Sequence, residues 1–198
     1  MTTLVLAHGA GAGSSHPWMK RVAAGLEVRG VQVVTFDFPY IVAGKSIPDR
    51  APVLEAAWRD VWKGVAERTT GPVFAGGKSM GGRMASMVAS KTGTDGFIPA
   101  PTGLVFFGYP LHPPAKPQQR RDAHLPHIHV PMLFLHGTRD GFGTPDEMED
   151  LVDTLPNATL RLCDQGDHSL IAPKKIDKTG QLLEDAMDFA ASWMLARG

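Results

Sequence analysis

One short stretch limits most strongly what this chain can fold into. An apolar run begins at Val73, residues 77–81 read Gly-Lys-Ser-Met-Gly, and an Ala- and Met-rich stretch follows. A Gly-x-Ser-x-Gly sequence between a strand and a helix is typical of a sharp turn with the serine at its apex. That serine needs an unusual backbone angle, and its neighbours must be small, as Gly77, Gly81 and Gly82 are. The sequence therefore predicts a strand–turn–helix unit that exposes the hydroxyl of Ser79.

A second interpretation of these residues is a phosphate-binding loop. Gly77-Lys78-Ser79 resembles the end of that motif, and so does Gly44-Lys45-Ser46. The motif needs another glycine five positions before its last glycine, and those positions hold Pro72 and Pro39. The mismatch argues against nucleotide hydrolysis.

Apolar runs and amphipathic stretches alternate along the rest of the chain, which indicates a parallel sheet with helices on both faces. The chain is long enough for one domain with a sizeable core, and we expect a single domain over residues 1–198. The segments after the second strand, up to Pro52, and over residues 91–101 are expected to be loops. Expected strands are 3–7, 31–36, the run before Ser79, 103–107, 132–136 and 159–162, and expected helices are 18–29, 53–68, 80–90, 145–155 and 178–196.

Three residue types with complementary chemistry fall where strands of this sheet end. A ligand binds at the carboxyl ends of parallel strands, and Ser79, Asp140 and His168 each come just after a predicted strand. A serine hydroxyl needs a base to take its proton and a carboxylate to orient that base. We therefore assign Ser79 as nucleophile, His168 as general base and then acid, and Asp140 as the orienting acid. Asp37, Asp164 and Asp167 remain alternative acids.

An oxyanion formed at this serine needs two backbone N–H donors. The residue after the serine, Met80, is expected to supply one. The other is expected from the small-residue loop at residues 8–11, from Ala10 or otherwise Gly11. Lys78 is expected to face solvent and receives no role.

Three sequences carry a resemblance to a known family: Gly-Gly-Lys-Ser-Met-Gly-Gly-Arg, Phe-Gly-Tyr-Pro-Leu-His-Pro-Pro and His-Gly-Thr-Arg-Asp-Gly-Phe-Gly. Over essentially its full length the chain resembles α/β-hydrolase-fold proteins, and in particular a compact subfamily of dienelactone-hydrolase-like and testis-expressed hydrolase-like proteins. The resemblance implies a Ser-Asp-His triad, which maps onto Ser79, Asp140 and His168. It also implies about six parallel strands, without the first two strands of the full fold, and a minimal lid. True dienelactone hydrolases have cysteine at the position of Ser79.

Residues 108–131 occupy the position where larger relatives insert a lid. The segment contains six prolines, which limit helix formation, so we expect a loop that borders the site. Its histidines at 124, 127 and 129 lack the cysteine or carboxylate spacing of a metal site, and we expect none. Lys116, Arg120 and Arg121 are interpreted as solvated surface charge rather than as a site for an anionic substrate.

Composition narrows the class of function. Twenty basic and twenty acidic residues give zero net charge, which argues against a nucleic-acid partner. No apolar run approaches a membrane span, no signal peptide is evident, and the single cysteine favours a cytoplasmic location. The leading hypothesis is a serine hydrolase that acts without a cofactor on a small ester or related acyl substrate. The alternative is a catalytically silent binding or scaffold protein with the same fold.

Overall fold

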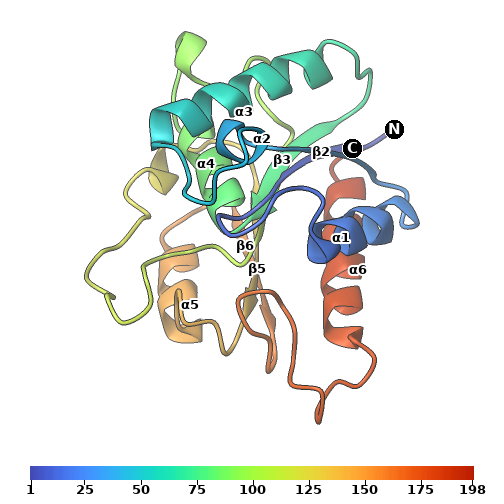
Figure 1. The fold of residues 1–198 in the computed structure, drawn as a ribbon, viewed down its shortest axis with the longest axis vertical. Helices are drawn as coiled ribbons and strands as arrows, with labels where there is room; N and C mark the ends of the chain where they lie inside the picture. The colour runs from blue at the N-terminus through green and yellow to red at the C-terminus, as the bar shows by residue number, and fades with distance from the viewer.

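The computed structural model describes all residues from Met1 to Gly198. Strands and helices alternate from one end of the chain to the other (Figure 1). The strands are β1 (Thr3–Ala7), β2 (Gln32–Phe36), β3 (Val73–Lys78), β4 (Leu104–Phe107), β5 (Met132–Gly137) and β6 (Ala158–Cys163). The α-helices are α1 (Pro17–Glu27), α2 (Pro39–Val42), α3 (Ala51–Ala66), α4 (Met80–Ala89), α5 (Pro145–Asp153) and α6 (Gln181–Leu195), and two 3₁₀ turns cover Gly93–Asp95 and Leu125–His127.

All six strands form one parallel sheet in the order β2-β1-β3-β4-β5-β6. Helices lie between most strands that are consecutive in sequence: α1 between β1 and β2, α2 and α3 between β2 and β3, α4 between β3 and β4, and α5 between β5 and β6. Such crossovers join parallel strands and place helices on both faces of the sheet. The predicted fold class, a single α/β domain with six parallel strands, is therefore confirmed.

Two apolar layers cover the sheet, one on each face. α1 and α6 pack on one face through residues such as Trp18 and Met187, whereas α3, α4 and α5 pack on the other (Figure 1). Successive strand residues alternate between these layers, because side chains in a strand point to opposite faces. Trp58 and Trp62 of α3 are buried in the second layer.

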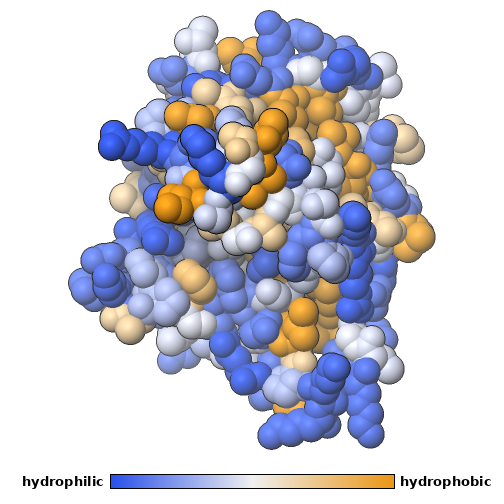
Figure 2. All heavy atoms as spheres, in the orientation of Figure 1, coloured by the Kyte–Doolittle hydropathy of each residue, from blue (hydrophilic) through white to orange (hydrophobic).

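The outer surface is mainly polar. Hydrophilic side chains cover most of the face shown in Figure 2, and hydrophobic side chains appear in smaller patches between them. None of the helices has the length and apolar character needed to cross a lipid bilayer.

Two expectations about irregular segments have different outcomes. The stretch after β2 was expected to be a loop, but it contains the short helix α2. Pro39 starts that helix with its fixed φ angle, and buried Tyr40 anchors it to the core. Residues 108–131 contain no α-helix, as predicted, although Tyr109, Leu125 and other apolar side chains fix the segment to the core.

Candidate active site

Ser79 lies at the turn between β3 and α4. Its backbone has φ 49° and ψ −117°, a sparsely populated region for a residue with a side chain. The two glycines of the motif make this turn possible, because their backbones pass close to other main-chain atoms. A Cβ on Gly77 would lie 2.6 Å from the nitrogen of Gly82, and one on Gly81 would lie 2.5 Å from the oxygen of His8. The turn predicted from the sequence is therefore present.

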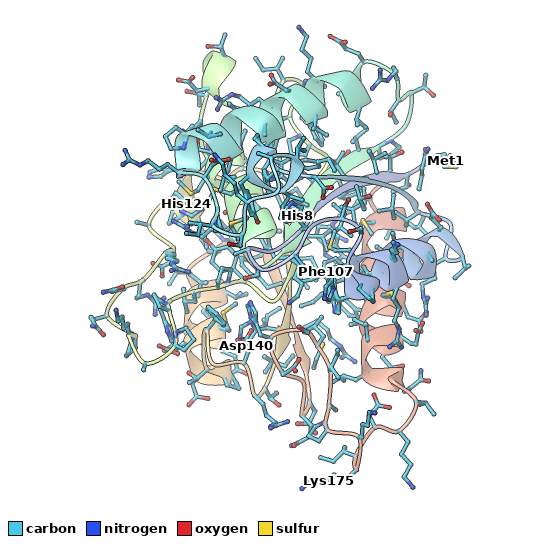
Figure 3. The ribbon with its side chains drawn as sticks, viewed as in Figure 1. Met1, His8, Phe107, His124, Asp140 and Lys175 are labelled. Carbon is cyan, nitrogen blue, oxygen red and sulfur yellow. The ribbon has the colours of Figure 1, made fainter.

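The loops after β3, β5 and β6 bring Ser79, Asp140 and His168 together. Ser79 Oγ lies 2.8 Å from His168 Nε2, and His168 Nδ1 lies 2.7 Å from Asp140 Oδ2. Asp140 is buried, and its other oxygen accepts a hydrogen bond of 2.8 Å from the backbone N–H of Phe142. Figure 3 labels Asp140, and also His8 and Phe107 from neighbouring strand ends at the same edge of the sheet.

The hydrogen bonds determine what each nitrogen of His168 can do. A carboxylate only accepts hydrogen bonds, so Asp140 assigns the proton of the neutral imidazole to Nδ1. The lone pair of Nε2 then faces the hydroxyl of Ser79. The Phe142 ring stacks on the imidazole with centroids 4.1 Å apart and an interplanar angle of 27°, which limits rotation of His168.

The three alternative acids have other partners. Asp167 Oδ1 accepts hydrogen bonds from the backbone of Ser169 and Ile171, and Asp37 Oδ1 accepts one from Ser14. Asp164 contacts the hydroxyl of Thr138 at 3.4 Å. Of the four aspartates considered from the sequence, Asp140 is the one that contacts the His168 ring.

The loop after β1 lies beside Ser79. A Cβ on Gly9 would lie 3.7 Å from the Cβ of Ser79, so this backbone passes close to the hydroxyl-bearing side chain. The N–H groups of Ala10 and Gly11 donate to no acceptor within the protein, and Met80, the first residue of α4, has no intrahelical acceptor for its N–H. These are the three donors that the sequence suggested.

Two side chains that the sequence did not single out hold this loop. Buried His8 bonds through Nδ1 to the oxygen of Gly9 at 2.7 Å and through Nε2 to the N–H of Phe38 at 3.1 Å. Its Nε2 accepts from that N–H, so His8 is neutral here, in agreement with burial lowering its pKa. The hydroxyl of Tyr40 donates to the oxygen of Ala10 at 3.0 Å. The partly apolar run around Tyr40 could have indicated an ordered segment packed on the core, but from the sequence it was expected to be a loop.

A second histidine, His136, lies behind Asp140. It is fully buried, and its Nε2 donates to the oxygen of Gly143 at 2.9 Å. Its Nδ1 lies 3.7 Å from Asp140 Oδ2 and has no hydrogen-bond partner. Burial lowers the pKa of His136, so it stays neutral and Asp140 keeps its interaction with His168.

The expectation for Lys78 was wrong, because its side chain is half-buried instead of facing solvent. Its ammonium donates to the oxygen of His168 at 3.1 Å and lies 5.1 Å from the centroid of the Trp18 ring. Burial lowers the pKa of Lys78.

Histidines of residues 108–131 contact protein groups individually. His112 Nε2 lies 3.1 Å from a carboxylate oxygen of Glu147, and His124 Nε2 lies 2.7 Å from Ser86 Oγ. Burial lowers the pKa of His124 to about 4. No three His, Cys, Asp or Glu side chains come together in an arrangement that could hold a metal ion.

Comparisons with known proteins agree on the fold. A family model described as alpha/beta hydrolase domain matches residues 1–195. A dienelactone hydrolase from Anabaena variabilis is 19% identical, with a TM-score of 0.71 over 99% of this chain and 86% of that one. The monoacylglycerol lipase of Paleococcus ferrophilus is 16% identical, with a TM-score of 0.72 over 99% and 95%. Est1E of Butyrivibrio proteoclasticus, in a structure with bound ferulic acid, is 14% identical, with a TM-score of 0.72 over 99% and 90%.

Proposed function

The chain belongs to the alpha/beta hydrolase domain family, and we propose that it is a serine hydrolase that cleaves a small ester or related acyl compound. The observation that carries this proposal is the continuous hydrogen-bond chain from Ser79 through His168 to Asp140, with contacts of 2.8 Å and 2.7 Å. Similar structures named as a monoacylglycerol lipase and a dienelactone hydrolase support the same reaction class by analogy of fold.

In the proposed reaction the hydroxyl of Ser79 attacks the carbonyl carbon of the substrate. His168 Nε2 takes the hydroxyl proton as the new C–O bond forms, and Asp140 stabilises the resulting imidazolium. Negative charge moves to the former carbonyl oxygen, where the N–H groups of Met80 and Ala10 (or Gly11) donate to it. Loss of one such donor costs about 2.7–4 kcal/mol in other hydrolases.

The reaction is then completed in two stages, formation of the acyl-enzyme and its hydrolysis. The bond to the leaving oxygen breaks as His168 returns its proton to that oxygen, which leaves the acyl group on Ser79. Water next attacks the acyl-enzyme while His168 takes a proton from it. His168 then returns that proton to Ser79 Oγ as the bond between the acyl carbon and this oxygen breaks, which releases the acid product and free Ser79. The protein's own side chains and backbone supply every group in this sequence, and we propose no cofactor.

Labelling with a fluorophosphonate tests the proposal without a known substrate. The reagent should modify the folded protein once, at Ser79, and peptide mass mapping should locate the adduct there. Ser79→Ala should abolish labelling. Ser46→Ala is a matched control, since Ser46 also follows a Gly-Lys pair but is exposed, and this variant should label fully.

Absence of any adduct on folded protein, or an adduct at another residue, would contradict the assignment. That result would favour the alternative function of a binding or scaffold protein, in which the same residues serve only to hold the loops together.

A further inference from the structure

A cavity beside Ser79 has a cationic wall that the proposed chemistry does not use. Its volume is about 290 Å³, and its lining includes Gly9, Gly11, His16, Met19, Lys78 and Ser169. At ~30 Å³ per molecule, it has room for roughly ten waters or a short organic group. Ser79 does not itself line the cavity, but three lining residues are its neighbours or neighbours of His168: Lys78 directly precedes Ser79, Gly9 belongs to the loop that passes Ser79, and Ser169 directly follows His168.

The ammonium of Lys78 has no carboxylate partner. Of its three N–H groups, one donates to the oxygen of His168, and the aromatic face of Trp18 supports the charge from one side. Asp140, the nearest catalytic carboxylate, is hydrogen-bonded to His168 and Phe142. A half-buried lysine without an ion-pair partner carries an electrostatic cost that an incoming anion would offset.

Two uncharged features around the cavity also favour an anion. His16 Nδ1 accepts a hydrogen bond of 3.2 Å from the N–H of Trp18, which places the proton of its ring on Nε2 as a donor. The N-terminus of α1 also begins at this wall, since His16 caps the helix, and a helix N-terminus favours negative charge. No acidic residue lines the cavity.

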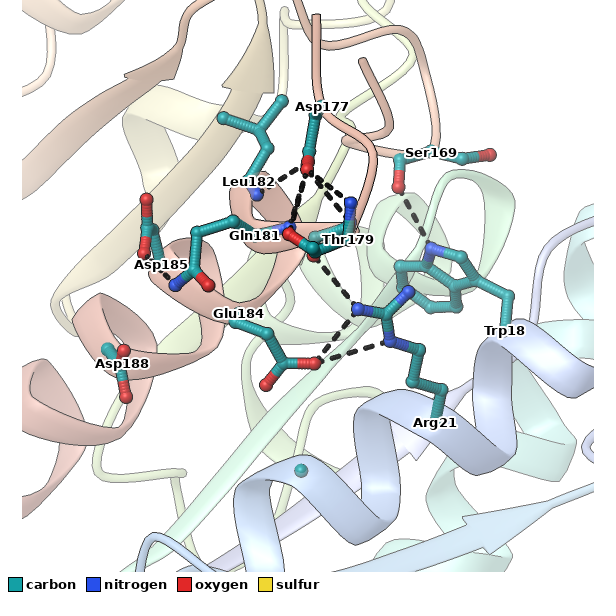
Figure 4. A network of polar contacts seen from close by, with 12 residues as sticks. Trp18, Arg21, Ser169, Asp177, Thr179, Gln181, Leu182, Glu184, Asp185 and Asp188 are labelled. Carbon is teal, nitrogen blue, oxygen red and sulfur yellow. Dashed lines mark hydrogen bonds and ion pairs between the residues drawn. The ribbon is translucent and has the colours of Figure 1, made fainter. Parts of the chain in front are cut away.

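The shape of this wall is fixed by contacts outside the catalytic residues. Trp18 Nε1 donates to the oxygen of Ser169 at 2.9 Å, which ties the start of α1 to the loop that carries His168 (Figure 4). On the next turn of α1, Arg21 bonds to Glu184 and to the oxygen of Gly180, which joins α1 to α6 (Figure 4). The Lys78 ammonium therefore lies between Trp18 and the backbone oxygen of His168, in a part of the structure where α1 is tied to the His168 loop.

We propose that Lys78 binds a carboxylate of the substrate, so that the enzyme is selective for small esters that carry a negative charge a few bonds from the scissile carbonyl. The inference rests on the proposed function, because it places the anion relative to the acyl group that Ser79 attacks. It gives the half-buried ammonium a partner and uses a cavity whose lining, apart from Lys78 and His16, is small or apolar.

The test measures binding separately from chemistry, in a Ser79→Ala background that cannot form the acyl-enzyme. Nuclear magnetic resonance titration gives the Kd of two isosteric pairs: monomethyl succinate against methyl succinamate, and acetoxyacetate against acetoxyacetamide. The first pair places the charge on the acyl side and the second on the leaving-group side. We expect the anionic member of at least one pair to bind about tenfold more tightly, since a hydrogen bond to a charged group is among the stronger ones.

Substitutions then test whether the charge of Lys78 is responsible for the preference for anionic esters. Lys78→Met should remove the preference, and Lys78→Arg should retain most of it, which covers the case in which the methionine variant fails to fold. Lys116→Met is the matched control from the exposed basic residues at 108–131 and should retain the preference in full.

Equal affinities within both pairs would overturn the inference, as would a preference that survives Lys78→Met or disappears in Lys116→Met. Equal weakening of charged and neutral esters by Lys78→Met would also overturn it, because that pattern indicates a lysine that only holds the backbone of His168. Failure of fluorophosphonate to label Ser79 concerns the proposed function and is a separate result.

Discussion

The substitution Asp140→Asn removes one charge while leaving the shape of the site almost unchanged. The N–H of Phe142 donates to Asp140 Oδ1, so the new side chain keeps its oxygen at that position. Its NH₂ group then takes the position of Oδ2, 2.7 Å from His168 Nδ1. An amide NH₂ donates only, so Nδ1 must become an acceptor and the ring proton must move to Nε2. In that tautomer His168 donates to Ser79 instead of accepting its proton.

The expected loss follows from the role of the base. An equivalent Asp-to-Asn change in another triad lowers kcat by about 10⁴, and at about 1.36 kcal/mol per tenfold this corresponds to roughly 5.4 kcal/mol of transition-state stabilisation. Folding should change little, because the hydrogen bond from the N–H of Phe142 persists unchanged and the one to His168 persists with donor and acceptor exchanged. A change of 1 kcal/mol would shift the Tm of a chain of this size by about 2–4 °C.

Hydrolysis of 4-nitrophenyl acetate, followed by absorbance, measures kcat, and circular dichroism measures the Tm of the same preparations. Asp167→Asn is the matched control, because Asp167 adjoins His168 in sequence and its Oδ1 can keep the bonds to Ser169 and Ile171. The reasoning is refuted if Asp140→Asn keeps more than a tenth of the activity with an unchanged Tm, or if Asp167→Asn is the variant that loses it.

Three further predictions concern the surroundings of the site. Tyr40→Phe removes the hydrogen bond to Ala10, worth about 0.5–1.5 kcal/mol, so kcat for 4-nitrophenyl acetate should fall about two- to tenfold; unchanged kcat would exclude a role in positioning the loop. Burial lowers the pKa of His124 to about 4, so the unfolded chain binds the extra proton first, and stability should decrease as pH falls from about 6.5 to about 4; the fall in Tm should be smaller in His124→Gln, and equal falls would contradict this. In a series of nitrophenyl esters, short acyl groups should react best, because the small cavity cannot bury long chains at about 0.8 kcal/mol per CH₂; a steady rise of kcat/KM with length would show that a larger apolar channel exists.

The sequence was sufficient to predict the fold and the position of the site residues along it. Parallel strands joined by helices bring their carboxyl ends to one edge, so residues that follow strands meet even when they are far apart in sequence. Ser79, Asp140 and His168 lie after β3, β5 and β6 for this reason. Their catalytic roles remain predictions.

The side chains that support the site were harder to predict. Tyr40 lies in a helix of four residues, which is too short to produce a readable helical period. His136 follows four residues of a buried strand, and nothing in its neighbourhood in sequence indicates that it faces Asp140. Contacts of this kind depend on how separate loops meet, and local patterns do not contain that information.

The position of Lys78 is different, because strand alternation already limits it. Phe74 packs in the layer between the sheet and α1 and α6, and Lys78 lies four residues later in the same strand, so both side chains point to the same face. That face is covered by α1, whose Trp18 ring centroid lies 5.1 Å from the Lys78 ammonium. The alternation therefore argues against a solvent-facing Lys78. Lys78 is the last residue of β3 and directly precedes Ser79. Because α1 covers its face of the sheet, the Lys78 side chain extends into the space beside Ser79.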